Sequence, residues 1–170
     1  MGFLRGKSKR DKLAADTLAG LRDQALRLSP NDIGAAPSAA RPDVWGILME
    51  TGYATAAASL VAFADGSASL YFSNGGGIIG AGEHRPVRLA AEELLSSVQQ
   101  HLPLFVPASS TPLPEVGRVC FYVRTFDGIR TAEASEDDLG HGRHPLSRVF
   151  HKGHAMISAM RGATPQLGNG

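Results

Sequence analysis

Two Asp-Gly pairs, each placed between apolar runs, constrain the fold of this chain more than any other feature. The pairs are Asp65-Gly66 and Asp127-Gly128. An Asp-Gly pair between two such runs predicts a tight turn between antiparallel strands, because both turn residues must take positive φ. A chain with two such hairpins is expected to contain an antiparallel sheet. The predicted strands that flank the pairs are residues 57–64, 67–73, 118–126 and 129–134.

A further strand and three helices follow from the spacing of apolar residues. The continuous apolar run of residues 44–51 is typical of a central strand. Stripes with steps of three and four predict helices over residues 11–28, 86–102 and 145–160. The element order is then helix, three strands, helix, two strands, helix. We therefore expect an α+β fold, a mainly antiparallel sheet of about five strands with the helices packed on one face.

Composition divides the chain into three parts. Residues 1–42 form a basic leader with an amphipathic helix and a Pro/Ala-rich linker, residues 43–161 a single α+β domain, and residues 162–170 a flexible tail. Residues 1–12 carry five basic groups and one acidic group, while the rest of the chain carries twelve basic and fifteen acidic groups. A mildly acidic body lacks the basic face of a nucleic-acid-binding domain, so no nucleic-acid partner is expected.

The leader helix has a narrow apolar stripe. Leu18, Leu21 and Leu28 lie on it, and this stripe could pack on the domain or bind a partner protein. No apolar stretch approaches the roughly 20 residues of a membrane span, and the first residues do not resemble a secretory signal. We therefore expect a cytoplasmic protein. Cys120, the single cysteine, lies in an apolar strand and is expected to be a buried, inert thiol.

Histidines and carboxylates concentrate between residues 136 and 154. These groups bind metals and transfer protons near neutral pH. Two histidine pairs, each separated by two residues, resemble the spacing of zinc ligands, and an aspartate could complete the set. The alternatives are surface histidines, or a pH- or ligand-sensing role. The candidate metal ligands are His141, His144, His151, His154, Asp137 and Asp138.

A glycine-rich segment precedes the second predicted helix and formally contains a Gly-x-Gly-x-x-Gly pattern. Glycines let backbone N–H groups approach an anion at a helix start. The preceding strand belongs to a hairpin, however, which argues against a dinucleotide site. An anion or small-ligand loop and a plain bend from sheet to helix both remain open. The candidate anion-binding residues are Gly75, Gly76, Gly77, Gly80, Gly82, His84 and Arg85.

The sequence contains no assembled catalytic motif, neither a Gly-x-Ser-x-Gly elbow nor a His-Glu-x-x-His pair. The element order is similar to that of the type III secretion chaperones and of profilin or roadblock-like modules, a similarity of topology alone. It implies a small α+β domain that binds other proteins, often as a dimer. We thus expect a non-catalytic interaction or adaptor/chaperone-like module without a cofactor, and the similarity implies that it is a homodimer. The alternatives are a metal- or anion-dependent enzyme that uses the C-terminal histidines and aspartates, with zinc as its candidate metal, and a structural subunit of a larger assembly.

Overall fold

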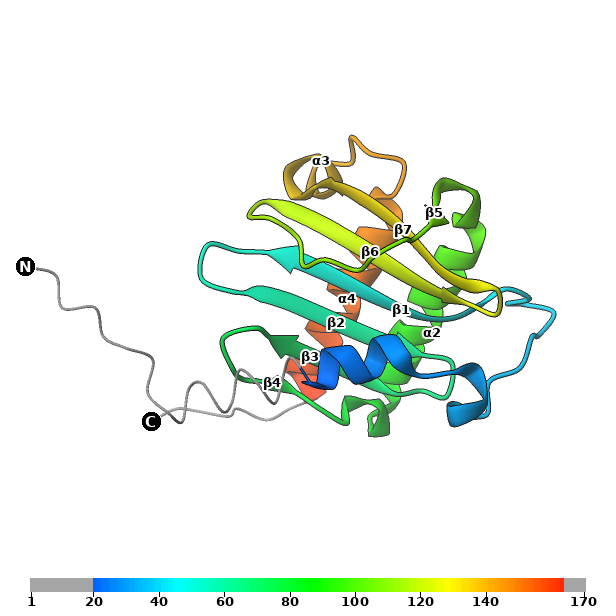
Figure 1. Ribbon diagram of the computed structural model, residues 1–170. Coiled ribbons are helices and arrows are strands. Elements are labelled where there is room, and N and C mark those ends of the chain that lie inside the picture. Colours follow the sequence, from blue (N-terminus) through cyan, green and yellow to red (C-terminus); the bar gives the residue numbers. More distant parts are fainter. Residues whose placement is uncertain (1–19, 164–170) are drawn as a thin grey trace, which may run out of the picture.

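The computed structural model describes residues 20–163, which form an α+β fold around one antiparallel sheet (Figure 1). The strand order is β4-β3-β2-β1-β6-β7-β5. This confirms the predicted fold class, with seven strands in place of about five. The two additional strands, β4 and β5, have two residues each, too few to show a period-two pattern. The strands are β1 (Val44–Gly52), β2 (Ala57–Phe63), β3 (Ala68–Phe72), β4 (Gly77–Ile78), β5 (Val106–Pro107), β6 (Arg118–Thr125) and β7 (Gly128–Ser135).

Both Asp-Gly pairs turn the chain between antiparallel strands, as the sequence predicts. Asp65-Gly66 joins β2 to β3, and Asp127-Gly128 joins β6 to β7. The two glycines have φ values of 90° and 131°. Among the described residues only glycines have positive φ, so the expectation that both residues of each turn take positive φ is wrong. Glycine alone supplies that conformation in each turn.

Two long helices, α2 (Arg85–Gln100) and α4 (Ser147–Ala163), cover one face of the sheet (Figure 1). Their apolar stripes and the inward side chains of the strands form the larger core cluster, in which Leu94, Leu95 and Met156 are fully buried. A short helix, α3 (Glu136–Gly140), precedes α4. It was not predicted, because five residues with one buried side chain show no helical stripe. The 3-10 helices are η1 (Pro30–Ile33), η2 (Ala81–Glu83) and η3 (Leu102–Leu104).

The opposite face of the sheet, here called the outer face, is also covered. Residues 20–27 form a helix, here called the N-terminal helix, that lies against it (Figure 1). The earlier part of the predicted leader helix, with Leu18, lies outside the described residues. All nine residues of β1 are buried, as expected for a strand covered on both sides. No helix among residues 20–163 has the length and apolar character to span a bilayer. The outer face carries Trp45, Leu48, Glu50, Ser59, Val61, Phe63, Tyr71, Cys120, Tyr122 and Arg124.

The contact of α4 with β1 depends on a glycine. A Cβ at Gly153 would lie 2.5 Å from Cε and 2.6 Å from Sδ of the buried Met49. We expect Gly153→Ala to destabilise the protein by about 1–3 kcal/mol through overpacking, measured by urea unfolding. Gly162→Ala is the control in the same helix, because a Cβ there meets nothing within 4 Å. Equal unfolding midpoints for the two variants would contradict this account.

Candidate functional site

A buried carboxylate lies at the centre of the outer face. Glu50 on β1 has a relative exposure of 0%. The strand register places Ser59 of β2 on one side of it and Cys120 of β6 on the other, and the Ser59 hydroxyl donates a hydrogen bond to the carboxylate. Burying an ionised carboxylate without a cationic partner costs several kcal/mol of folding free energy. The stability of the protein therefore depends on which groups cover Glu50.

Arg22 of the N-terminal helix supplies the partner. Its Nε donates to Oε2 of Glu50 and its Nη2 to Oε1, both at 2.7 Å. Nη2 also donates to the Thr111 carbonyl at 2.7 Å. Burial lowers the pKa of Arg22, but the hydrogen bonds and charge of Glu50 outweigh it, and the pKa lies above its ordinary value. This bidentate pair joins the helix, β1 and the loop before β6.

Arg124 on β6 holds the other end of the same helix. Its Nη1 donates to the Ala25 carbonyl at 2.7 Å and its Nη2 to the Leu28 carbonyl at 2.5 Å. The guanidinium also lies 4.6 Å from the centre of the Trp45 ring. Carbonyl oxygens at the end of a helix lack partners within the helix and attract positive charge. The two arginines therefore determine both the position and the direction of the helix.

Two hollows flank the helix where it meets the outer face. One, of about 110 Å³, is lined by Arg22, Asp23, Ser59, Tyr71 and Leu113 among others. The other, of about 150 Å³, is lined by Leu21, Ala25, Leu28, Val61, Phe63 and Tyr71 among others. Leu21 and Leu28, two of the three predicted partner-binding residues, thus face the sheet of their own chain. The helix leaves part of the apolar surface beneath it unfilled.

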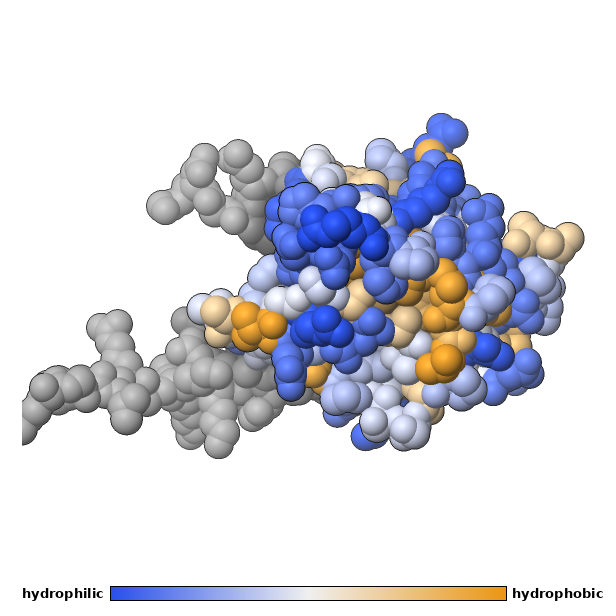
Figure 2. Space-filling view, turned by 90° about the horizontal axis from the view of Figure 1, so that it is seen from above, coloured by the Kyte–Doolittle hydropathy of each residue, from blue (hydrophilic) through white to orange (hydrophobic). Residues whose placement is uncertain are grey.

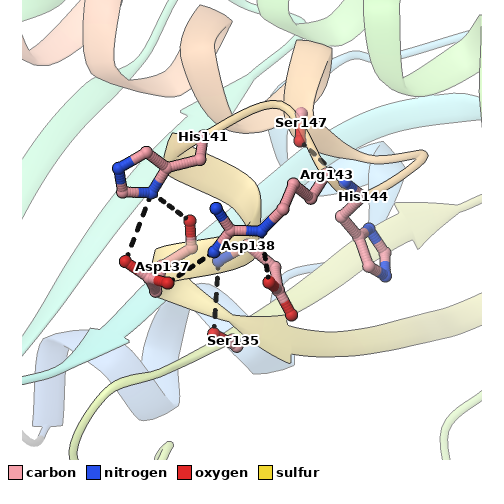
Figure 3. Close-up of polar contacts among 7 residues, drawn as sticks. All are labelled: Ser135, Asp137, Asp138, His141, Arg143, His144 and Ser147. Atoms are coloured by element: carbon pink, nitrogen blue, oxygen red, sulfur yellow. Dashed lines mark hydrogen bonds and ion pairs between the residues drawn. The ribbon is translucent and has the colours of Figure 1, made fainter.

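The acidic segment is arranged around an arginine (Figure 3). Arg143 Nη2 donates to Asp137 Oδ2 at 2.5 Å, and its Nε donates to Asp138 Oδ1 at 3.0 Å. His141 Nδ1 lies 2.8 Å from the Asp137 carbonyl oxygen and 3.2 Å from its Oδ1. In Figure 3, His141 and His144 lie on either side of Arg143. Both predicted aspartate ligands are therefore already paired with a cation.

The four histidines do not lie at one centre. His144 accepts a hydrogen bond from the Leu146 amide through Nδ1 at 3.0 Å, which closes the turn before α4. His151 is exposed. His141 and His154 line one open hollow of about 500 Å³, together with Glu136, Asp137 and Phe150. Within residues 20–163, no group of three or more His, Cys, Asp or Glu side chains is placed to hold a metal ion. The zinc site stays a prediction, now without a geometry that supports it.

Backbone conformation and close packing explain why glycines are concentrated in residues 75–82. Gly75, Gly76, Gly77 and Gly80 have positive φ, and a Cβ at Gly82 would collide with the Gly66 carbonyl oxygen in the β2–β3 turn. Arg88 donates to the carbonyls of Gly82 and Glu83 at 3.2 and 2.9 Å. The two other predicted anion-binding residues, His84 and Arg85, are exposed at the start of α2. Anion binding at this segment stays a prediction.

Sequence reasoning missed the residues that organise the outer face: Glu50, Arg22, Ser59 and Arg124. Glu50 did carry a signal, because it is the one charge in the apolar run of residues 44–51. Its partner lies 28 residues earlier, and no local pattern connects them. The inert thiol predicted at Cys120 is consistent with its burial, which raises the pKa of the thiol. No family model, curated protein or solved structure matches the chain.

Removing Arg22 tests the buried pair. We expect Arg22→Ala to lower the free energy of unfolding by about 3 kcal/mol, because it leaves the Glu50 carboxylate without its cation. Arg27→Ala, an exposed arginine of the same helix, is the control and should change stability by less than about 0.5 kcal/mol. Both are measured by urea unfolding. Similar losses for the two variants would rule out a dominant role for the pair.

His154 predicts a pH dependence. Its Nε2 is buried without a hydrogen-bond partner, and burial, with the charges of His151 and Arg161, lowers its pKa. As the pH falls below about 6.5, the unfolded chain binds a proton that the folded chain does not, so stability falls. His154→Gln should reduce the loss of melting temperature between about pH 7.5 and pH 5. His84→Gln is the control, because the exposed His84 side chain makes no capping hydrogen bond, and it should leave the loss of melting temperature unchanged. Equal losses in wild type and His154→Gln would refute this account of His154.

Proposed function

We propose that the chain is a non-catalytic protein-interaction module of the adaptor or chaperone kind, and that its outer face is the binding surface for a protein partner or a second copy. The observation that carries this proposal is the second apolar cluster on that face, covered by a helix near one end of the described chain. The sheet with α2 and α4 already forms the larger core without that helix. The outer face therefore serves a purpose beyond closing the main core.

The chemistry of the outer face supports the proposal. An antiparallel sheet with helices on one face commonly exposes a polar surface on the other. Here Trp45, Phe63, Tyr71 and Tyr122 lie on that other face and are at most 8% exposed. Tyrosine, tryptophan and arginine are the residue types most enriched at the centre of protein interfaces.

The β5 edge of the sheet offers a second apolar surface for self-association. Leu104 and Val106 are 46% and 60% exposed there. Figure 2 views the molecule from above Figure 1, and on the side that it shows hydrophobic residues lie next to strongly hydrophilic ones. Strand β5 pairs with only two residues of β7, so much of the outer edge of β7 has no strand beside it. An edge of this kind supports contact between copies of a chain.

One observation favours the rival function, a metal- or anion-dependent enzyme. His141 and His154 line the same hollow as Glu136 and Asp137, and a carboxylate and an imidazole in one hollow suit proton transfer. Arg143 and the local hydrogen bonds of His144 count against it, because they occupy groups that a metal would need. A structural subunit of a larger assembly would use the same surfaces as the interaction module.

Light scattering and affinity capture with the full chain test the proposed function. We expect either a dimer at micromolar concentration or captured proteins that an excess of untagged full chain displaces. A monomer that captures no displaceable protein would contradict the module. The same preparation, purified without a metal-binding tag, is analysed for transition metals and for a zinc-induced thermal shift, which the rival enzyme requires.

A further inference from the structure

We propose that the outer face binds an amphipathic helix of a partner protein that carries an arginine at the place of Arg22, and that the chain's own N-terminal helix is a displaceable occupant of this site. The inference rests on the proposed function and adds the chemical class of the partner. Three features of the site carry it: the carboxylate at its centre, the arginine at its end, and the incomplete packing of its present occupant.

The central carboxylate selects arginine. Glu50 presents both oxygens to one guanidinium, and the Thr111 carbonyl accepts a third hydrogen bond from the same group. A planar guanidinium satisfies such a set of acceptors, whereas the ammonium of lysine is a point charge that cannot donate in this fork geometry. Because Glu50 is 0% exposed, any helix that covers it has to supply this cation.

Arg124 determines where the bound helix ends. It binds the carbonyls of Ala25 and Leu28, three and six residues after Arg22. Only a helix that terminates at this distance beyond its arginine leaves those carbonyl oxygens free to accept. Ala25 is 4% exposed, so the residue three positions after the arginine faces the sheet and must be apolar. The site therefore recognises the C-terminal end of a helix with an Arg-x-x-apolar pattern.

The present occupant packs incompletely. The hollows of about 110 and 150 Å³ lie along the helix, and Tyr71 lines both of them. Of the eight described helical residues, Ala25 alone is buried. Most of the stability of a helix in a protein comes from its tertiary contacts, and residues 36–40, part of the segment between this helix and β1, are all exposed. The helix can therefore leave the outer face while the core beneath α2 and α4 stays intact.

Tethering favours the chain's own helix, since its local concentration is high. A free peptide should therefore bind poorly to the wild-type chain and better to a chain whose own helix has lost its cation. The probe is a fluorescein-labelled synthetic peptide with the sequence of residues 15–35, titrated against full-length protein by fluorescence anisotropy. We expect full-length Arg22→Ala to bind it at least about tenfold more tightly than wild type.

Two changes test the chemistry of the site. The Arg22→Lys peptide should bind full-length Arg22→Ala at least about tenfold more weakly than the parent peptide, and full-length Arg22→Ala/Glu50→Gln should bind the parent peptide at least about tenfold more weakly than Arg22→Ala. Equal affinity of wild type and Arg22→Ala for the peptide would overturn the proposal, as would insensitivity to either change.

Hydrogen exchange of the wild-type full chain tests displacement without any variant. Amides of residues 24–28 should exchange at least about 100-fold faster than those of β1, because the helix opens locally while the sheet stays folded. Equal protection would overturn the proposal. If the peptide fails while the chain is a dimer or still captures displaceable partners, the arginine-helix partner is refuted and the interaction module stands. Peptide binding to a monomer that captures no partner would instead refute the module.

Discussion

The ion pair between Arg22 and Glu50 is the interaction on which the outer half of the structure depends. Glu50 lies on β1, the middle strand of the sheet, and it has no exposure to solvent. A carboxylate in that position is tolerated only with a cation and further hydrogen bonds around it. Arg22 and Ser59 supply them, so the place of the N-terminal helix is determined by electrostatics as much as by apolar contact.

The sheet consequently has two faces with different character. The inner face, under α2 and α4, is a continuous apolar core, whose packing tolerates little change in side-chain volume. The outer face combines aromatic side chains with Glu50 and Arg124, and the hollows beside the helix show that it is filled less completely. A few directional, charge-assisted contacts therefore hold the helix on the outer face, whereas close packing stabilises the inner one.

The sequence predicted the elements whose pattern is local. The apolar stripe of α2 and the two Asp-Gly pairs are patterns formed by residues close together in the sequence. The helix and the two hairpins that they predict are confirmed. Strands β4 and β5 and helix α3 were missed because two to five residues are too few to show a period. The histidine spacing along the chain suggested a shared centre, but a turn separates His144 from α4 and gives its Nδ1 a local partner.

The candidate site was harder to predict than the fold, for a physical reason. Arg22, Glu50 and Arg124 come from a helix and two strands that are far apart in sequence, and their meeting depends on the register of the sheet. One-residue changes of register would move Glu50 to the inner face. Such a site follows from tertiary structure, whereas a loop motif would have been visible in the residues alone.

Gly52 connects the end of β1 to this arrangement. The Gly117 amide donates to the Gly52 carbonyl at 2.9 Å, and a Cβ at position 52 would collide with the Glu115 carbonyl oxygen. Glu115 and Gly117 belong to the loop before β6, which also carries the Thr111 carbonyl that accepts a hydrogen bond from Arg22. Because Gly52 has no side chain, this loop can approach β1 closely enough for Thr111 to reach the guanidinium. A methyl group at position 52 would therefore disturb the contacts of a helix thirty residues earlier in the sequence.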